Sequence, residues 1–173
     1  MKYLLIIFSC FLSSFSWSKD IFIKNLFKKD DVFYEKYSDI PFTGKIVGLL
    51  EGTFKKGMKH GEFIKYYSDG KILNKINYFE NILDGDWIEY YRNGNLLRKK
   101  TFKEGLLEGK YIDYYSFGQI LSKRFYVKNK LEGIYKEFYK NGQLHIKKNY
   151  KNNKLEGQYI VYHEYEFKPV VQI

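Results

Sequence analysis

The chain has 173 residues, of which 45% are hydrophobic and 20% aromatic, and its formal net charge at pH 7 is +10. This length suits one domain, and the hydrophobic fraction is enough for a core, which argues against a disordered chain. The basic excess favours an acidic partner, such as an anionic membrane, an acidic protein or nucleic acid.

Residues 1–18 have the form of a secretory signal peptide. Lys2 is followed by an apolar run, and Ser16-Trp17-Ser18 makes a small-x-small cleavage site. The run, about 13 residues long, is too short to serve comfortably as a membrane anchor. Nine residues precede Cys10, which argues against a lipid anchor on that cysteine. We therefore predict an exported protein, periplasmic or extracellular, whose mature chain contains no cysteine and needs no disulfide.

Residues 19–43 fit no repeat frame and are predicted to form an N-terminal cap. The repeat domain is predicted to span residues 44–173. Its first unit, residues 44–60, is shortened, because Gly44 precedes Gly61 by 17 residues whereas later units are 24 residues long. A proline near the end of the chain, Pro169, cannot donate to a strand ladder, which favours an edge strand there.

A 24-residue repeat occupies the rest of the chain. Full units begin at Gly61, Gly85, Gly109 and Gly133, and a partial unit begins at Gly157. Counted from the opening glycine as position 0, positions 2, 5 and 17 are aromatic in every unit that contains them, and position 6 is tyrosine in the four full units. Such residues prefer a pleated surface, and a fixed period of this size is typical of stacked repeats. We predict an all-β fold, an elongated antiparallel sheet of stacked 24-residue β-hairpin repeats.

The hairpin tips are predicted at dipeptides that favour two-residue type I′ turns, and these are Asp69-Gly70, Asn93-Gly94 and Asn141-Gly142. In the corresponding register, Gly85 lies opposite Phe102 and leaves room for its ring, and Tyr90 lies opposite Leu97. Phe117-Gly118 lacks the Asn or Asp of the other tips, so we expect a different or strained turn there.

The repeat pattern resembles a known family. The columns G-x-[FWY]-x-x-[FY]-[FY]-x-x-G-x-[LI], followed by a later aromatic and L-[DE]-G, are similar to the bacterial variant of the MORN repeat. The run Pro41-Phe42-Thr43-Gly44, followed by Gly52 to Gly57, resembles the opening segment of the YwqK-family antitoxins, and the likeness covers residues 41–167. The resemblance implies hairpin stacking and a membrane-associated scaffold, and the YwqK label implies neutralisation of a toxin by binding.

Two columns of the repeat are candidate parts of a binding surface: the tyrosines Tyr67, Tyr91, Tyr115 and Tyr139, and the lysines Lys75, Lys99, Lys123 and Lys147. Tyrosine contributes contact area and a hydroxyl together. Lysines in one column recur every ~10 Å along the sheet, close to a Debye length, and this spacing suits an anionic polymer, a membrane or an acidic protein face. Alternatively, the lysines occupy exposed strand positions and guard against edge aggregation.

No pattern for chemistry is present in the sequence. The acids Asp84, Glu108, Glu132 and Glu156 recur at one per unit, ~10 Å apart, which is too far for a shared metal ion or for acid–base work on one bond. They are expected to pair with lysines. His60, His145 and His163 occupy unrelated columns, and no nucleophile motif, P-loop or dinucleotide fingerprint occurs. We therefore predict no catalytic residues, no cofactor and no metal site.

The prediction for function is a non-catalytic, exported scaffold that binds another macromolecule, most directly a protein, through its sheet surface. One alternative is a YwqK-type antitoxin or immunity protein that covers a toxin. Another is an envelope protein held on anionic lipid by the lysine column. Nucleic acid is disfavoured because the aromatic columns are expected to form the core and because the protein is expected to be exported.

Overall fold

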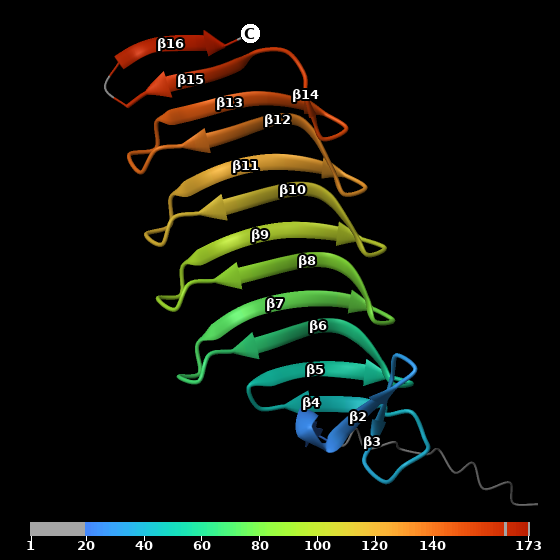
Figure 1. Ribbon diagram of the computed structural model, residues 1–173. Coiled ribbons are helices and arrows are strands. Elements are labelled where there is room, and N and C mark those ends of the chain that lie inside the picture. Colours follow the sequence, from blue (N-terminus) through green and yellow to red (C-terminus); the bar gives the residue numbers. More distant parts are fainter. Residues whose placement is uncertain (1–19, 165, 173) are drawn as a thin grey trace, which may run out of the picture.

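The computed structural model describes residues 20–164 and 166–172, and most of the chain in these ranges forms strands (Figure 1). The predicted signal peptide and Cys10 lie outside the described residues. The elements in chain order are β1 (Asp20–Phe22), the 3-10 turn η1 (Ile23–Asn25), β2 (Leu26–Lys29), β3 (Val32–Glu35), β4 (Gly44–Val47), β5 (Leu50–Lys55), β6 (Met58–Tyr66), β7 (Ile72–Phe79), β8 (Ile82–Tyr90), β9 (Leu96–Lys103), β10 (Leu106–Tyr114), β11 (Ile120–Val127), β12 (Lys130–Phe138), β13 (Leu144–Lys151), β14 (Lys154–Leu155), β15 (Tyr159–His163) and β16 (Glu166–Gln172).

The strands form one long open sheet in which spatial order follows chain order. From β4 to β13 each strand pairs antiparallel with the next, and β15 and β16 complete the far end. β16 is an edge strand and contains Pro169, in agreement with the edge predicted from the proline. At the other end β1 pairs parallel with β4, while β2 and β3 form a separate hairpin. The predicted fold, an elongated antiparallel sheet of stacked hairpins, is confirmed.

The predicted register is confirmed along most of each hairpin. Gly85 pairs with Phe102, and the pairing continues in step to Glu89 opposite Arg98. Near the tip the prediction was wrong, because the register shifts after Glu89 and Tyr90 pairs with Leu96. The shift follows from a tip loop that is longer than the sequence suggested.

The tip turns, which join β6 to β7, β8 to β9, β10 to β11 and β12 to β13, contain three-residue loops. In one of them the N–H of Gly94 donates to the carbonyl of Tyr91 at 2.9 Å, and the N–H of Tyr91 donates to Asn95 at 2.8 Å. This is a type I turn closed by a glycine bulge, in which only the glycine has positive φ. The predicted type I′ turns are therefore wrong. Phe117 needs no unusual conformation, and the tip at Gly118 has the same hydrogen bonds as the others.

Two-residue turns with positive φ at both residues occur instead at the opposite ends of the strands, between each unit and the next. Their central residues are Lys56-Gly57, Glu80-Asn81, Glu104-Gly105, Lys128-Asn129 and Asn152-Asn153. Because type I′ turns require positive φ at both positions, asparagine and glycine are favoured at the second one. Asn and Gly therefore do indicate type I′ turns in this chain, but these turns lie between units. The prediction placed them at the hairpin tips.

Each two-residue turn is hydrogen bonded to the preceding unit. Asn129 donates its N–H to the carbonyl of Leu107 at 2.9 Å, and its side-chain oxygen accepts from the N–H of Leu107 at 2.6 Å. Glu108 accepts from the N–H of Lys128 at 2.7 Å, and Glu132 bonds the next turn in the same way. Two acids of this column thus contact backbone, and among the described residues only Glu156 has the expected lysine partner, Lys151, at 3.8 Å.

The opening glycines are required for their backbone conformation, and at Gly85 also for space, because a Cβ there would lie 3.1 Å from the Cβ of Asn77. A Cβ on Gly109 would meet nothing within 4 Å, but its φ is +89°, a value that residues with side chains rarely adopt. In the same place the three residues of β10 between Leu107 and Tyr111 lie opposite a single residue of β9, Thr101. This irregularity bends the strand, and Figure 1 shows the bend near the start of each even-numbered strand from β6 to β12.

The hydrophobic core is at the N-terminal end of the sheet. Ile21, Phe42, Ile46, Phe54 and Phe63 are buried, and Phe54 is fully enclosed. Figure 1 shows the β2–β3 hairpin lying against this end of the sheet. Beyond it the aromatic columns are only half-buried. The expectation that these columns form a core along the whole chain was therefore wrong, because nothing in the described part of the chain forms a second layer over the later units.

Candidate binding faces of the sheet

Alternation along each strand divides the repeat between two faces. Trp87 pairs with Lys100 and the next residue, Ile88, pairs with Lys99, so these two pairs project to opposite sides. We call one side the aromatic face, formed by Trp87, Lys100, Phe102, Tyr111, Arg124, Tyr126, Tyr135, Lys148 and Tyr150. The other is the lysine face, which includes Lys75, Lys99, Lys110, Lys123, Lys136 and Lys147.

Rings and cations alternate along the aromatic face. Trp87 packs against Phe102 with centroids 5.8 Å apart, and Tyr111 packs against Tyr126 at the same distance. The ammonium of Lys100 lies 3.9 Å from the Trp87 centroid, and burial lowers the pKa of this lysine. Arg124 lies 3.9 Å from the ring centre of Tyr111. These cation–π contacts hold the rings and charges of the open face in a defined arrangement.

One carboxylate organises the middle of this face. Asp113 accepts hydrogen bonds from Arg98 Nε at 2.6 Å, Arg124 Nη2 at 2.8 Å and the Ser122 hydroxyl at 3.1 Å. Asp113 and Ser122 are buried, with 8% and 3% of their surfaces exposed. The carboxylate holds both guanidinium groups against the neighbouring rings. Loss of this carboxylate would destabilise the sheet, because both guanidinium groups would lose their shared partner.

The four candidate tyrosines form a ladder at the tip turns. Each hydroxyl donates to a backbone carbonyl one unit further along: Tyr67 to Tyr90 at 3.0 Å, Tyr91 to Tyr114, Tyr115 to Phe138 and Tyr139 to Tyr162, each at 2.8 Å. Their rings are half-buried. The structure thus gives these residues a role in joining successive hairpins, which the column of tyrosines did not indicate by itself.

Replacing Tyr91 with phenylalanine should lower the free energy of unfolding by about 1 kcal/mol, because it removes one such hydrogen bond and keeps the ring. Urea unfolding of the chain and the variant measures the difference. The matched control is Tyr90 to phenylalanine, for which the structure shows no hydroxyl hydrogen bond within its described residues. Equal losses in the two variants would contradict a stabilising ladder.

The four candidate lysines differ in their surroundings although they share one column and one face. Lys99 pairs with Asp86 at 2.8 Å, and Lys75 is 4.0 Å from Glu62. Lys123 and Lys147 have no carboxylate partner among the described residues. The predicted surface is therefore not one patch, because the tyrosines line the tip turns and the lysines lie in the middle of the strands.

The MORN repeat variant family matches at residues 59–80, 83–104, 107–128 and 131–152, which together are about half of the chain. The chain belongs to the MORN repeat variant family. Each matched segment runs from one strand through a tip turn to the return strand. A MORN repeat scaffold is a binding module built of repeats, and the family is in general non-catalytic. No curated protein matches this MORN repeat protein.

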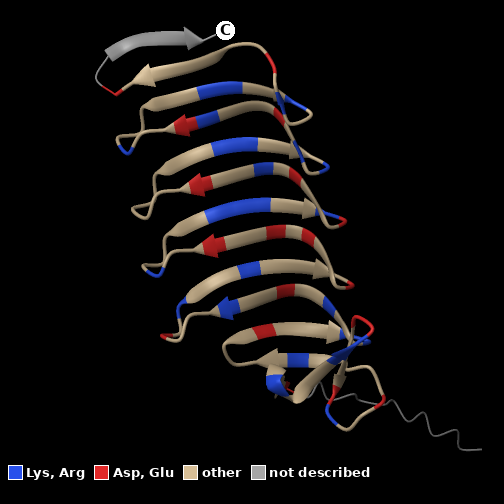
Figure 2. Ribbon diagram, viewed as in Figure 1, with Lys and Arg blue, Asp and Glu red and all other residues tan. Residues whose placement is uncertain are grey.

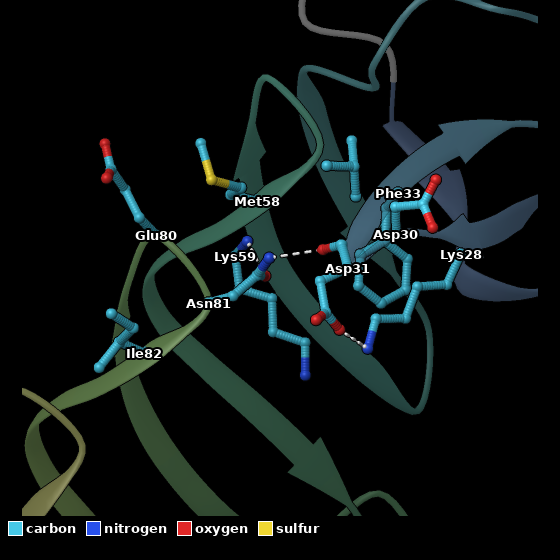
Figure 3. A pocket seen from close by; sticks show the side chains of 10 residues that line it. Lys28, Asp30, Asp31, Phe33, Met58, Lys59, Glu80, Asn81 and Ile82 are labelled. Atoms are coloured by element: carbon cyan, nitrogen blue, oxygen red, sulfur yellow. Dashed lines mark hydrogen bonds and ion pairs between the residues drawn. The ribbon is translucent and has the colours of Figure 1, made fainter.

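A hollow of about 540 Å³ lies where the cap of this MORN repeat protein meets the first full repeats (Figure 3). Its polar groups bond one another. The side-chain amide of Asn81 donates to the carbonyl of Asp31 at 2.7 Å, and Lys28 pairs with the Asp31 carboxylate at 2.5 Å. Burial lowers the pKa of Lys59, whose ammonium lies 4.6 Å from the Tyr78 ring centre. We interpret the hollow as the seam that attaches the cap to the repeats.

Within residues 20–164 and 166–172 of this MORN repeat protein, no group of three or more His, Cys, Asp and Glu side chains is placed to hold a metal ion. No helix in these ranges is long and apolar enough to span a membrane.

Proposed function

We propose that this MORN repeat protein is exported and binds a partner protein on its aromatic face without catalysing a reaction. The proposal rests on a difference in burial: the aromatic columns are buried at the N-terminal end of the sheet and half-buried in the later units. Under the cap, Phe54 and Phe63 are 0% and 3% exposed. In the later units the equivalent rings are half-buried and the face is open. A partner protein would cover these units as the cap covers the first ones.

The residue types on this face suit protein binding. Trp87, Tyr111, Arg98 and Arg124 belong to the residue types that contribute most at protein interfaces, because their large side chains lose much surface to water on binding. Their mutual cation–π and ion-pair contacts already restrict their rotamers. Binding would then cost less side-chain entropy than it would on a mobile surface. The resemblance to the YwqK family suggests that a toxin is one partner of this kind.

A capture experiment with the mature chain, residues 19–173, tests the proposal. The chain is incubated with an envelope extract of the source cells, and a retained protein is identified and purified. Its affinity is then measured for the chain and for a variant with Trp87→Ala and Tyr111→Ala. We expect at least a tenfold loss of affinity, because two central interface rings are removed.

The matched control carries Ile88→Ala and Ile112→Ala, which lie next to the two rings in sequence but on the lysine face. It should bind within about twofold of the unchanged chain, since its aromatic face is intact. Equal affinity of the aromatic variant and the unchanged chain would refute the aromatic face as the binding site. Absence of the protein from the envelope and external fractions would refute export.

A further inference from the structure

Three lysines on neighbouring strands lie directly opposite one another on the lysine face. Lys123 of β11 pairs with Lys136 of β12, and Lys136 pairs with Lys147 of β13. Figure 2 shows basic segments side by side on these three strands. Neighbouring strands are about 4.8 Å apart, and like charges in direct opposition destabilise a sheet. The row exists because Lys136 occupies a column that is isoleucine in the other units, Ile64 and Ile88 among them.

This row of three lysines is not neutralised, in contrast to the equivalent lysines earlier in the sheet. Lys75 and Lys99 have acids in the first column after the opening glycine, Glu62 and Asp86. In the two following units that column contains Lys110 and Ile134. Within the part of the chain that the structure describes, no carboxylate pairs with Lys123, Lys136 or Lys147. The face therefore changes from neutral to strongly basic halfway along the sheet.

An apolar hollow lies beside the row. It has a volume of about 390 Å³ and is lined by Ile120 and Phe138, by Gly118 and Gly142, and by Lys123. A Cβ on either glycine would meet nothing within 4 Å, so the hollow is open on the side of the tip turns. Ile134, which neighbours the row, is 50% exposed. The basic row is thus combined with a place for one apolar side chain.

We propose that the lysine row binds an acidic segment of a protein in extended conformation, with one apolar side chain in the hollow. Alternate side chains of an extended segment project to one side at about 6.7 Å intervals. Two carboxylates two residues apart can therefore lie over the three ammonium groups. Because Lys123 both ends the row and lines the hollow, an apolar side chain that follows them can be placed in the hollow. Charge complementarity supports this occupant, and a free phosphate would leave the hollow empty. The site lies on the face opposite the one in the proposed function.

The test uses a fluorescently labelled peptide with the sequence Asp-Ser-Asp-Ser-Leu between glycines and the mature chain at low ionic strength. Fluorescence anisotropy measures the affinity. The decisive variant carries Lys136→Ile and Ile134→Asp, which give the fourth full unit the residues of the second at these two columns. We expect at least tenfold weaker binding of the peptide. The matched control carries Lys75→Gln and Lys99→Gln, in the same column but paired with acids, and should change binding by less than twofold.

Three outcomes would overturn the proposal: no binding of the peptide, equal binding by the decisive variant, or an equal loss in the control. Binding of anionic vesicles that the peptide fails to displace would assign the row to a membrane surface instead. The melting temperature of the decisive variant should equal or exceed that of the unchanged chain, since like charges are removed. If the double variant does not fold, the single variant Lys136→Ile replaces it in the binding test. Trp87→Ala with Tyr111→Ala should leave peptide binding unchanged, which separates this site from the aromatic face.

Discussion

Replacing Phe54 with alanine is expected to lower the free energy of unfolding by about 3 to 5 kcal/mol, because it creates a cavity in the only extensive core of the described chain. Phe54 is 0% exposed. Its ring lies 4.9 Å from Phe33, 5.9 Å from Phe42 and 5.3 Å from Phe63, measured between centroids. These contacts join the cap to the sheet, so the cap should separate from the repeats first.

Phe102→Ala is the matched control for this prediction. Phe102 has the same place in the repeat frame, but it is half-buried, and its ring packs against Trp87 with centroids 5.8 Å apart. We expect a loss of no more than about 2 kcal/mol, since less apolar surface is withdrawn from water. Denaturant unfolding followed by circular dichroism and by aromatic fluorescence measures both variants. A similar loss of unfolding free energy in the Phe54 and Phe102 variants would show that the hydrophobic core is not confined to the region under the cap.

Replacing Asp113 with alanine is expected to cost about 3 kcal/mol, because Arg98 and Arg124 would remain on the sheet without their shared carboxylate. The side chain of Arg98 is 35% exposed and that of Arg124 21%. Water can therefore reach part of each guanidinium group that has lost its partner. For this reason the expected loss of unfolding free energy is at the lower end of the range for buried ion pairs that lose one partner.

Asp86→Ala provides the comparison for Asp113. Asp86 pairs with Lys99, but the side chains are 37% and 42% exposed. Exposed ion pairs contribute at most about 1 kcal/mol, so this variant should be close to the unchanged chain. Urea unfolding at two salt concentrations measures both. A loss at Asp113 as small as that at Asp86 would mean that the carboxylate does not organise the aromatic face.

The two kinds of turn show where reasoning from dipeptides succeeds and where it fails. Asn93-Gly94 has the residues of a type I′ turn, yet the structure places a type I turn with a glycine bulge there. Glu104-Gly105 carries a weaker signal and forms the two-residue turn with positive φ at both residues. The tip turn has one left-handed position and the two-residue turn has two, but glycine or asparagine is favoured in both kinds of turn, so the residue type alone does not separate them. The number of residues in each loop depends on the register of the flanking strands.

The candidate site was predicted in part. The lysine column was found from its spacing, but the neutralisation of Lys75 and Lys99 and the free row at Lys123 depend on which residues lie opposite them. The aromatic face could have been found by separating the columns into odd and even positions. It was instead interpreted as core, because a sequence shows that a face is apolar without showing whether another layer covers it.

The sequence by itself determined that this protein is a stack of 24-residue hairpins, because rings and glycines that recur at one period specify strands, bends and a register. Only the tertiary structure decided where the cap ends and which face stays open. The same aromatic columns are buried at Phe63 and half-exposed at Tyr135. The physical reason is that burial depends on the presence of a second layer, and the contacts of the β2–β3 hairpin with the first strands are non-local, so the repeat does not encode them.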